Sequence, residues 1–235
     1  MPNSPDNFYL LNYVLNVIDD LRMTKRFLEI LDDGTLWKWV SISITNALYG
    51  TMLAALMNGD QANVMATDRV RKKACKDFDE LQKAGRVERH FRTIATDKRV
   101  YIDDRVRERI RLRKVKIISF KEALARIQDP KRMKWRHQEC LKISKPDEAK
   151  ILKVRQTFRN NFEHFPPGEW GIDVGGFPDL CFPVIDSIEF LFNDSRIFGI
   201  YEDFRNNRHE IEAMITDIKS MLRGKRISYG ASDTA

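Results

Sequence analysis

The chain has 235 residues, of which 43% are hydrophobic and 32% charged, a balance typical of a globular protein with one sizeable core. Its three cysteines are far apart and form no CxxC pair, which argues against a disulfide framework or a cysteine zinc site. The N-terminal sequence MPNSPDNFYLL has no basic region ahead of an apolar run, so no signal peptide is predicted. We expect a cytoplasmic protein that requires no cofactor and no metal ion.

Two helices are predicted at the start of the chain. Residues 6–31 keep hydrophobic side chains at three- and four-residue intervals until the sequence DDGT interrupts the pattern. Residues 36–57 form the second helix, which carries no charge between Trp39 and Gly59, so a membrane span has to be considered. Its many hydroxyl and amide side chains favour instead a helix buried in the core or in a dimer interface, and no membrane association is predicted.

The middle of the chain is basic. Residues 61–145 hold 26 Lys and Arg against 12 Asp and Glu, the charge expected of a protein that binds a phosphate backbone. A solvated helical surface of mixed charge explains the same composition, and both interpretations stay open. We treat residues 61–143 as a basic insertion. Within it we predict a helix over 61–84, an irregular to helical stretch over 86–118 with short strands as the alternative at 101–102 and 115–118, and a short helix over 119–127.

An amphipathic helix is predicted over residues 145–165. Ser144 followed by Asp147 is a capping-box-like start, and Pro146 is tolerated in the first turn. Apolar side chains recur along it at helical spacing, and two prolines end it because neither can donate to the helical ladder. The apolar stripe consists of Ile151, Val154, Phe158, Phe162 and Phe165, and the stop consists of Pro166 and Pro167.

The last turns of this helix carry Arg159, Asn160, Glu163 and His164. A histidine with a pKa of about 6.5 exchanges protons near neutral pH, and an arginine offers a charged fork that matches phosphate oxygens. RNA supplies its own nucleophile, the 2′-hydroxyl, so these groups could cleave it without a metal. In an ideal α-helix Arg159 and His164 point about 140° apart, so a common ligand would need an unwound turn or a second copy of the helix. A structural role, in which both side chains cap the helix end, explains the same residues.

Other cations are candidates for supporting contacts. A second pair with the same spacing, Arg132 and His137, lies in a basic stretch of poor periodicity, and we interpret that spacing as coincidence. Arg132, Arg136 and Arg155 are predicted as candidate phosphate or RNA contacts.

The sequence FRNNFEHFPPGEWGIDVGGFPDL, which starts at Phe158, resembles the signature of HEPN domains (higher eukaryotes and prokaryotes nucleotide-binding). It is similar to a bacterial branch whose members are mostly uncharacterised or related to abortive-infection proteins. The resemblance implies an all-α, HEPN-like helical bundle that forms homodimers, so that two copies of the motif line one cleft. It also implies a metal-independent endoribonuclease in toxin–antitoxin, phage-defence or RNA-processing systems.

The resemblance also implies residue roles. His164 would act as general acid or base, Arg159 would hold the scissile phosphate, and Asn160 would orient them. Glu163, which lies beside His164 in the sequence, is a further candidate for a supporting role. An antitoxin or another protein is an implied partner besides RNA. In the subgroup whose antitoxin is a nucleotidyltransferase, a tyrosine stands two places after the histidine, where this chain has Pro166.

The end of the chain is predicted to complete one helical domain over residues 1–222. A loop rich in glycine and proline follows the motif, and residues 223–235 are predicted to be disordered. The two expected helices span 179–193 and 201–222. The alternative function is a non-catalytic HEPN-type module that binds RNA, a nucleotide or a protein partner.

Overall fold

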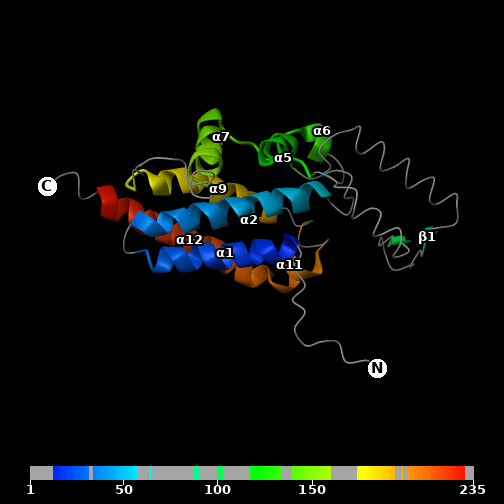
Figure 1. Ribbon diagram of the computed structural model, residues 1–235, viewed down its shortest axis with the longest axis horizontal. Helices are drawn as coiled ribbons and strands as arrows, with labels where there is room; N and C mark the ends of the chain where they lie inside the picture. Colours follow the sequence, from blue (N-terminus) through cyan, green and yellow to red (C-terminus); the bar gives the residue numbers. More distant parts are fainter. Residues whose placement is uncertain are drawn as a thin grey trace, which may run out of the picture. The chain divides into compact units, whose positions relative to one another are not determined.

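The computed structural model describes a set of helices and one pair of short strands (Figure 1). The described residues are 13–31, 34–57, 64, 87–89, 100–102, 117–133, 139–159, 174–193, 197 and 201–230. The chain divides into two compact units: Met1–Gly59 together with Ala123–Ala235, and Asp60–Glu122. The prediction of an all-α protein is confirmed as far as the predominance of helix is concerned.

The first unit is built around α2 (Trp37–Met57), which continues from the short 3-10 helix η1 (Gly34–Leu36). Fifteen of the 21 residues of α2 are buried, including the polar Thr45 and Thr51. Their hydroxyls donate hydrogen bonds to backbone carbonyls one turn earlier in the same helix, at 2.6 and 2.8 Å. Because these polar groups are satisfied within the helix, α2 can lie in the core despite its hydroxyl content.

Residues Gly34–Met57 are the one stretch, within the described part of the chain, that is long and apolar enough to cross a membrane. Of the apolar window in this stretch, 78% is buried inside the protein. That burial is the pattern of a core helix, as the sequence interpretation favoured.

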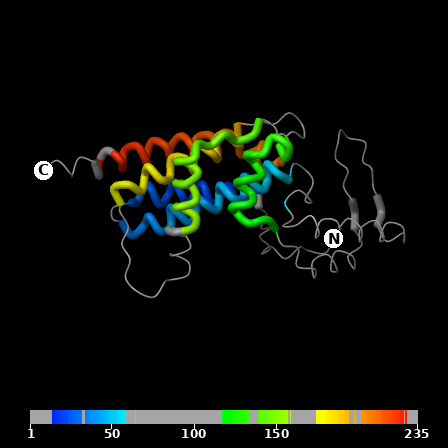
Figure 2. The backbone as a smooth tube through the Cα atoms, turned by 90° about the horizontal axis from the view of Figure 1, so that it is seen from above, coloured from blue at the N-terminus to red at the C-terminus, as the bar shows by residue number. Residues whose placement is uncertain are grey.

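Three further helices run alongside α2: α1 (Tyr13–Glu29), α9 (Phe177–Asn193) and α12 (Arg208–Gly230) (Figure 2). α1 packs on α2 and α12, and α9 packs on α2 and α12. Ion pairs connect the outer edges of these contacts. Arg22 and Lys25 of α1 pair with Glu210 and Asp217 of α12 at 2.7 Å each, and Lys219 of α12 pairs with Asp186 of α9 at 2.6 Å.

Shorter helices lie outside this bundle. They are α5 (Phe120–Ile127), α6 (Pro130–Met133), α7 (Lys145–Leu152) and α11 (Glu202–Asn206). α7 runs across the bundle in both views and packs on α9 (Figures 1 and 2). The backbone N–H of Leu141 donates to the Ile127 carbonyl at 3.0 Å, which holds the segment before α7 against the end of α5.

Two predictions about the C-terminal part were wrong. The single helix expected over 201–222 is broken at Asn207, whose backbone (φ −103°, ψ 14°) separates α11 from α12. The disordered tail expected from residue 223 is helical to Gly230. Tertiary contacts hold this last part, because the Lys225 ammonium donates to the Leu31 carbonyl and Arg226 pairs with Asp179 at 3.1 Å.

The second unit contains an antiparallel pair of strands, β1 (Val87–Arg89) and β2 (Val100–Ile102), with Glu88 opposite Tyr101. A strand therefore covers residues 101–102, where short strands were the alternative, and the irregular to helical stretch predicted over 86–118 was wrong at β1 and β2. The Ile118 N–H donates to the Val64 carbonyl at 2.9 Å within the same unit. The helix predicted over 61–84 lies outside the described residues.

Candidate functional site

The motif helix begins as its sequence predicts. Ser144 is extended at the N-cap position (φ −67°, ψ 151°), and its hydroxyl oxygen accepts a hydrogen bond from the Asp147 N–H at 3.2 Å. The same hydroxyl donates to the Asp147 carboxylate at 2.6 Å. Pro146 occupies the first turn, where its missing N–H has no intrahelical partner to lose. The cap therefore fixes where α7 starts.

The second half of this helix is wound differently from its first half. From Lys153 to Arg159 the chain forms a π-helical segment, η3, with i→i+5 hydrogen bonding in place of i→i+4. π-Helical turns are rare and are found frequently at functional sites. The angle of about 140° between Arg159 and His164 stays a prediction, because residues 160–164 lie outside the described part of the chain.

The predicted apolar stripe packs into the core as far as the structure describes it. Ile151 and Val154 are fully buried, and Phe158 is 7% exposed. Phe158 meets Phe177, the first residue of α9, edge to face, with ring centroids 4.9 Å apart. Phe177 in turn lies 4.7 Å from the ring centroid of Trp37, the first residue of α2. We call Trp37, Phe158 and Phe177 the aromatic cluster.

The aromatic cluster brings together the two ends of the segment that carries the motif. Arg159 follows Phe158 directly, and the chain returns to the described structure at Val174, three residues before Phe177. Near this return point Gly34 lies so close to Val174 that a Cβ at residue 34 would be 2.9 Å from the Val174 Cγ1 atom. Both ends of the motif segment are therefore fixed at the start of α2.

Arg155 lies one turn before Arg159 and faces inward in part. Its Nη1 atom is buried. Its positive charge reaches Tyr49 of α2, whose pKa is raised by burial and, as a smaller opposing effect, lowered by Arg155. The structure thus places this candidate phosphate contact against the core helix, with part of its guanidinium turned away from solvent.

Of the other predicted site residues, the structure describes some and leaves others outside the described ranges. Arg132 is exposed on α6. Arg159 is the last residue of η3, and its backbone is helical. Asn160, Glu163 and His164 lie outside the described residues, as does Arg136. The structure therefore positions the helix that leads to the motif and the cluster that anchors it, and the mutual arrangement of Arg159 and His164 stays a prediction.

A cleft of about 490 Å³ opens at the other end of the motif helix. It lies between the start of α7, α9 and the C-terminal part of α12, with Phe182 and Phe190 among its lining residues. Its carboxylates are already engaged, since Asp179 pairs with Arg226 and Asp186 pairs with Lys219. The cleft is thus a feature of the α7 start, and Arg159 is not among its lining residues.

Sequence reasoning missed two parts of this arrangement. Phe177 was placed in a loop, although it is the residue that links Phe158 to Trp37. The close approach of Gly34 to Val174 joins segments far apart in the chain, and a single glycine in a turn gives no sign of such a partner. Among the described residues, no group of three or more His, Cys, Asp or Glu side chains could hold a metal ion.

No protein-family model, no curated protein and no solved structure matches this chain.

Proposed function

We propose that the chain is a metal-independent endoribonuclease of HEPN type that cuts RNA in a cleft formed by two copies of Arg159, Asn160 and His164. The observation that carries the proposal is the anchoring of the motif segment. Phe158, a buried residue of η3, directly precedes Arg159, and its contact with Phe177 joins the two ends of the segment. A motif placed at such an anchored helix end can be held in a fixed geometry, which catalysis requires.

The chemistry follows from the residue types. His164 transfers a proton to or from the 2′-hydroxyl or the leaving oxygen, since an imidazole titrates near neutral pH. Arg159 binds the scissile phosphate through its charged fork, and Asn160 orients the two groups. Glu163 supports the site. The reaction is a transesterification in which the 2′-oxygen attacks phosphorus and the 5′-oxygen leaves.

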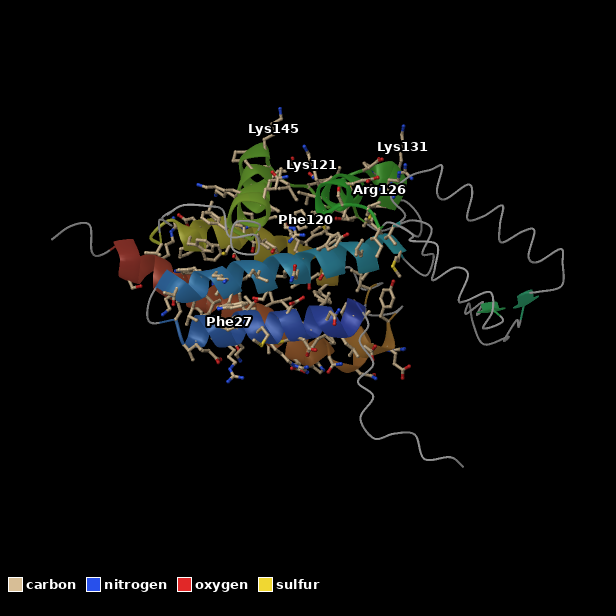
Figure 3. The ribbon with its side chains drawn as sticks, in the orientation of Figure 1. Phe27, Phe120, Lys121, Arg126, Lys131 and Lys145 are labelled. Atoms are coloured by element: carbon tan, nitrogen blue, oxygen red, sulfur yellow. The ribbon has the colours of Figure 1, made fainter. Side chains whose placement is uncertain are left out.

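Exposed cations favour RNA as the substrate class. Lys131 on α6 and Lys145 at the start of α7 extend from the surface of the helical unit (Figure 3). Arg132, next to Lys131, is also exposed. Cations spaced along a surface neutralise successive phosphates and give salt-dependent binding. A role in phage defence or as a toxin, with an antitoxin or other protein partner, belongs to this proposal.

The test is cleavage of a mixed RNA pool in EDTA by the wild type and by the variants Arg159→Ala and His164→Ala. His137→Ala is the matched control, because His137 stands in the other Arg-x4-His pair of the chain. Thermal unfolding of each protein is measured alongside. We expect the wild type and His137→Ala to cut, and the two motif variants to lose cutting without losing thermal stability.

Two results would count against the proposal. If the wild type does not cut at high protein concentration but binds RNA, the chain is the non-catalytic binding module. If His164→Ala lowers the unfolding temperature and cutting together, the histidine caps the helix end, a role that contributes about 0.3–1 kcal/mol.

A further inference from the structure

Two phenylalanine rings line the cleft at the start of α7. Phe182 and Phe190 are both partly exposed, whereas Phe177 and Phe192 of the same helix are buried. The two partly exposed rings lie just over two turns apart on α9, about 12 Å along its axis. The cleft volume of about 490 Å³ is within the range of ligand sites in proteins. A cleft of this size with aromatic walls can hold a flat ring that stacks on a phenylalanine.

Carboxylates also line this cleft, but each already has a cationic partner. An Asp147 carboxylate oxygen lies 3.5 Å from the Lys150 ammonium. The other two pairs, given above, are Asp179 with Arg226 and Asp186 with Lys219. The carboxylates therefore leave little uncompensated negative charge that would repel an anion.

Positive charge without a partner lies at the edge of the cleft. Lys142 lines the cleft, Lys145 follows the lining residue Ser144, and both lysine side chains are exposed. Neither lysine forms an ion pair within the part of the chain that the structure describes. Lys145 extends away from the helical bundle (Figure 3). An ammonium group that has no carboxylate partner is free to bind a phosphate.

Aromatic walls and unpaired cations together are the features of a site for single-stranded nucleic acid. Bases of any identity stack on aromatic rings, while lysines neutralise the phosphates of the backbone. A duplex does not meet these requirements, because its bases already stack on one another and are not free to contact a protein ring. The chemistry of the cleft therefore favours a nucleotide that is not base-paired.

We propose that the cleft between α7 and α9 binds an unpaired nucleotide of an RNA strand. The base stacks on Phe182 or Phe190. The phosphates on either side of it bind Lys142 and Lys145. The inference takes its ligand class from the proposed function and adds a second RNA contact away from the motif.

The position of the cleft gives this second contact a consequence for the cut. Lys145 and Arg159 are about 20 Å apart along α7 and η3 at the rise of a helix. That length corresponds to about six nucleotides of a stacked strand. A strand bound at both places is cut at a fixed distance from the nucleotide in the cleft, so the cleft selects where the RNA is cut.

The first experiment measures binding by fluorescence anisotropy. The probe is a labelled single-stranded RNA with methylated 2′-oxygens, which blocks the nucleophile and prevents cutting. Phe182→Leu and Phe190→Leu keep an apolar side chain and remove the ring. At least one of them should weaken binding about five-fold or more, the lower end for one lost stack, and the matching Tyr variant should bind like the wild type. Trp39→Leu is the matched control, because it removes an exposed ring that stacks on Phe27, on the opposite side of α2 from Lys145 (Figure 3).

The salt dependence of the same binding tests the lysines. Lys142→Gln should reduce the slope of log K against log salt by about 0.7, the value for one phosphate contact in a single strand. Arg26→Gln should leave the slope unchanged, since it removes one charge from an exposed position on α1. Unlabelled single strand should displace the probe, whereas duplex RNA or mononucleotides at the same nucleotide concentration should not. Thermal unfolding checks that each variant is folded.

The second experiment locates the contact. A single-stranded RNA that contains 4-thiouridine is crosslinked to the full chain by light, and the modified peptides are identified by mass spectrometry. We expect crosslinks within residues 141–150 or 179–190. Crosslinks confined to the second unit, Asp60–Glu122, would assign RNA binding to the basic insertion and overturn the inference.

The results separate this inference from the proposed function. If the wild type binds the probe through the cleft but cuts no RNA, the catalytic proposal fails and the inference stands. If the wild type cuts RNA while the phenylalanine and Lys142 variants bind like the wild type, the inference alone fails. A wild type that does not bind the single strand, or a probe displaced equally well by mononucleotides, also overturns the inference.

Discussion

The carboxyl group of Asp20 gives a prediction whose sign and size both follow from the structure. Asp20 is half-buried on α1, and burial, with the charge of Asp19 as a second cause, raises its pKa to about 7. An unfolded aspartate has a pKa of about 3.9. The folded state therefore holds this proton more tightly, so the group contributes stability that is complete below pH ~4 and is lost as the pH rises through ~7.

The magnitude can be bounded. A rise from about 3.9 to about 7 corresponds to about 4 kcal/mol for a group fully shielded from water. Asp20 is only half-buried, so solvent screening reduces the effect to about 1–2 kcal/mol. Asp20→Asn removes the ionisation and keeps the shape. We expect the variant to match the wild type below pH ~4, to gain on it between pH ~4 and ~7, and to be more stable by about 1–2 kcal/mol above pH ~8.

Urea unfolding at several pH values measures this difference, at protein concentrations too low for association. Glu210→Gln is a control of opposite sign, because hydrogen bonds from Arg22 lower the pKa of Glu210. Loss of the Glu210 charge should destabilise the protein by less than about 1 kcal/mol at neutral pH. In acid the variant and the wild type should be equally stable. An Asp20→Asn variant that is less stable than the wild type above pH ~8, or a difference that ignores pH, would refute the reasoning.

Three further substitutions test local features by urea unfolding. Gly224→Ala should raise the free energy of unfolding by about 0.5–1 kcal/mol, because the residue is inside α12 and nothing lies within 4 Å of its added Cβ. A lower free energy of unfolding would show that the helix ends earlier. Gly34→Ala should lower the free energy of unfolding by about 1–3 kcal/mol, because the added Cβ would overpack against Val174. Adding Val174→Ala to this variant should restore part of the loss. If the effects of the two substitutions on stability simply add, the contact is contradicted. Ser144→Ala should cost about 0.5–2 kcal/mol through the lost cap, and an unchanged stability would show that the cap hydrogen bond contributes nothing.

Long periodic segments could be read from the sequence. The second helix, predicted over 36–57, was observed as η1 and α2, and the short helix expected over 119–127 was observed as α5. The start of the motif helix was also correct, because a cap and a proline fix it locally. These features depend on residues close together in the chain, so a single sequence contains their cause.

Features decided by distant contacts could not be read in the same way. Lys225 and Arg226 hold the end of α12 by contacts with Leu31 and Asp179, although the glycine and charges around them look like a helix end. Pro130 follows the helix predicted over 119–127 and has the position of a typical helix stop. It begins α6 instead, where the Asp129 carboxylate accepts a hydrogen bond from the Lys131 N–H at 2.9 Å. A proline that ends one helix can equally occupy the first turn of the next.

The π-helical winding of η3 is the feature of the candidate site that the spacing of apolar residues could not reveal, and it gives a decisive last prediction. A π-helix uses more residues per turn than an α-helix. Removing the exposed residue Gln156 should therefore let η3 close as an α-helical turn with Phe158 still facing Phe177. The expected change in the free energy of unfolding is under about 1.5 kcal/mol, as for a core that keeps its packing.

The same deletion in an α-helix has the opposite consequence. Deleting the exposed Ser220 from α12 rotates every later residue by about 100° and turns the buried Leu222 away from the core. That deletion should cost about 2–5 kcal/mol, the range for removing a buried leucine. If deletion of Gln156 costs as much as deletion of Ser220, the helix before Arg159 is wound as an ordinary α-helix. A small cost for Gln156 alone would establish the π-helical turn and, with it, the direction in which the backbone presents Arg159.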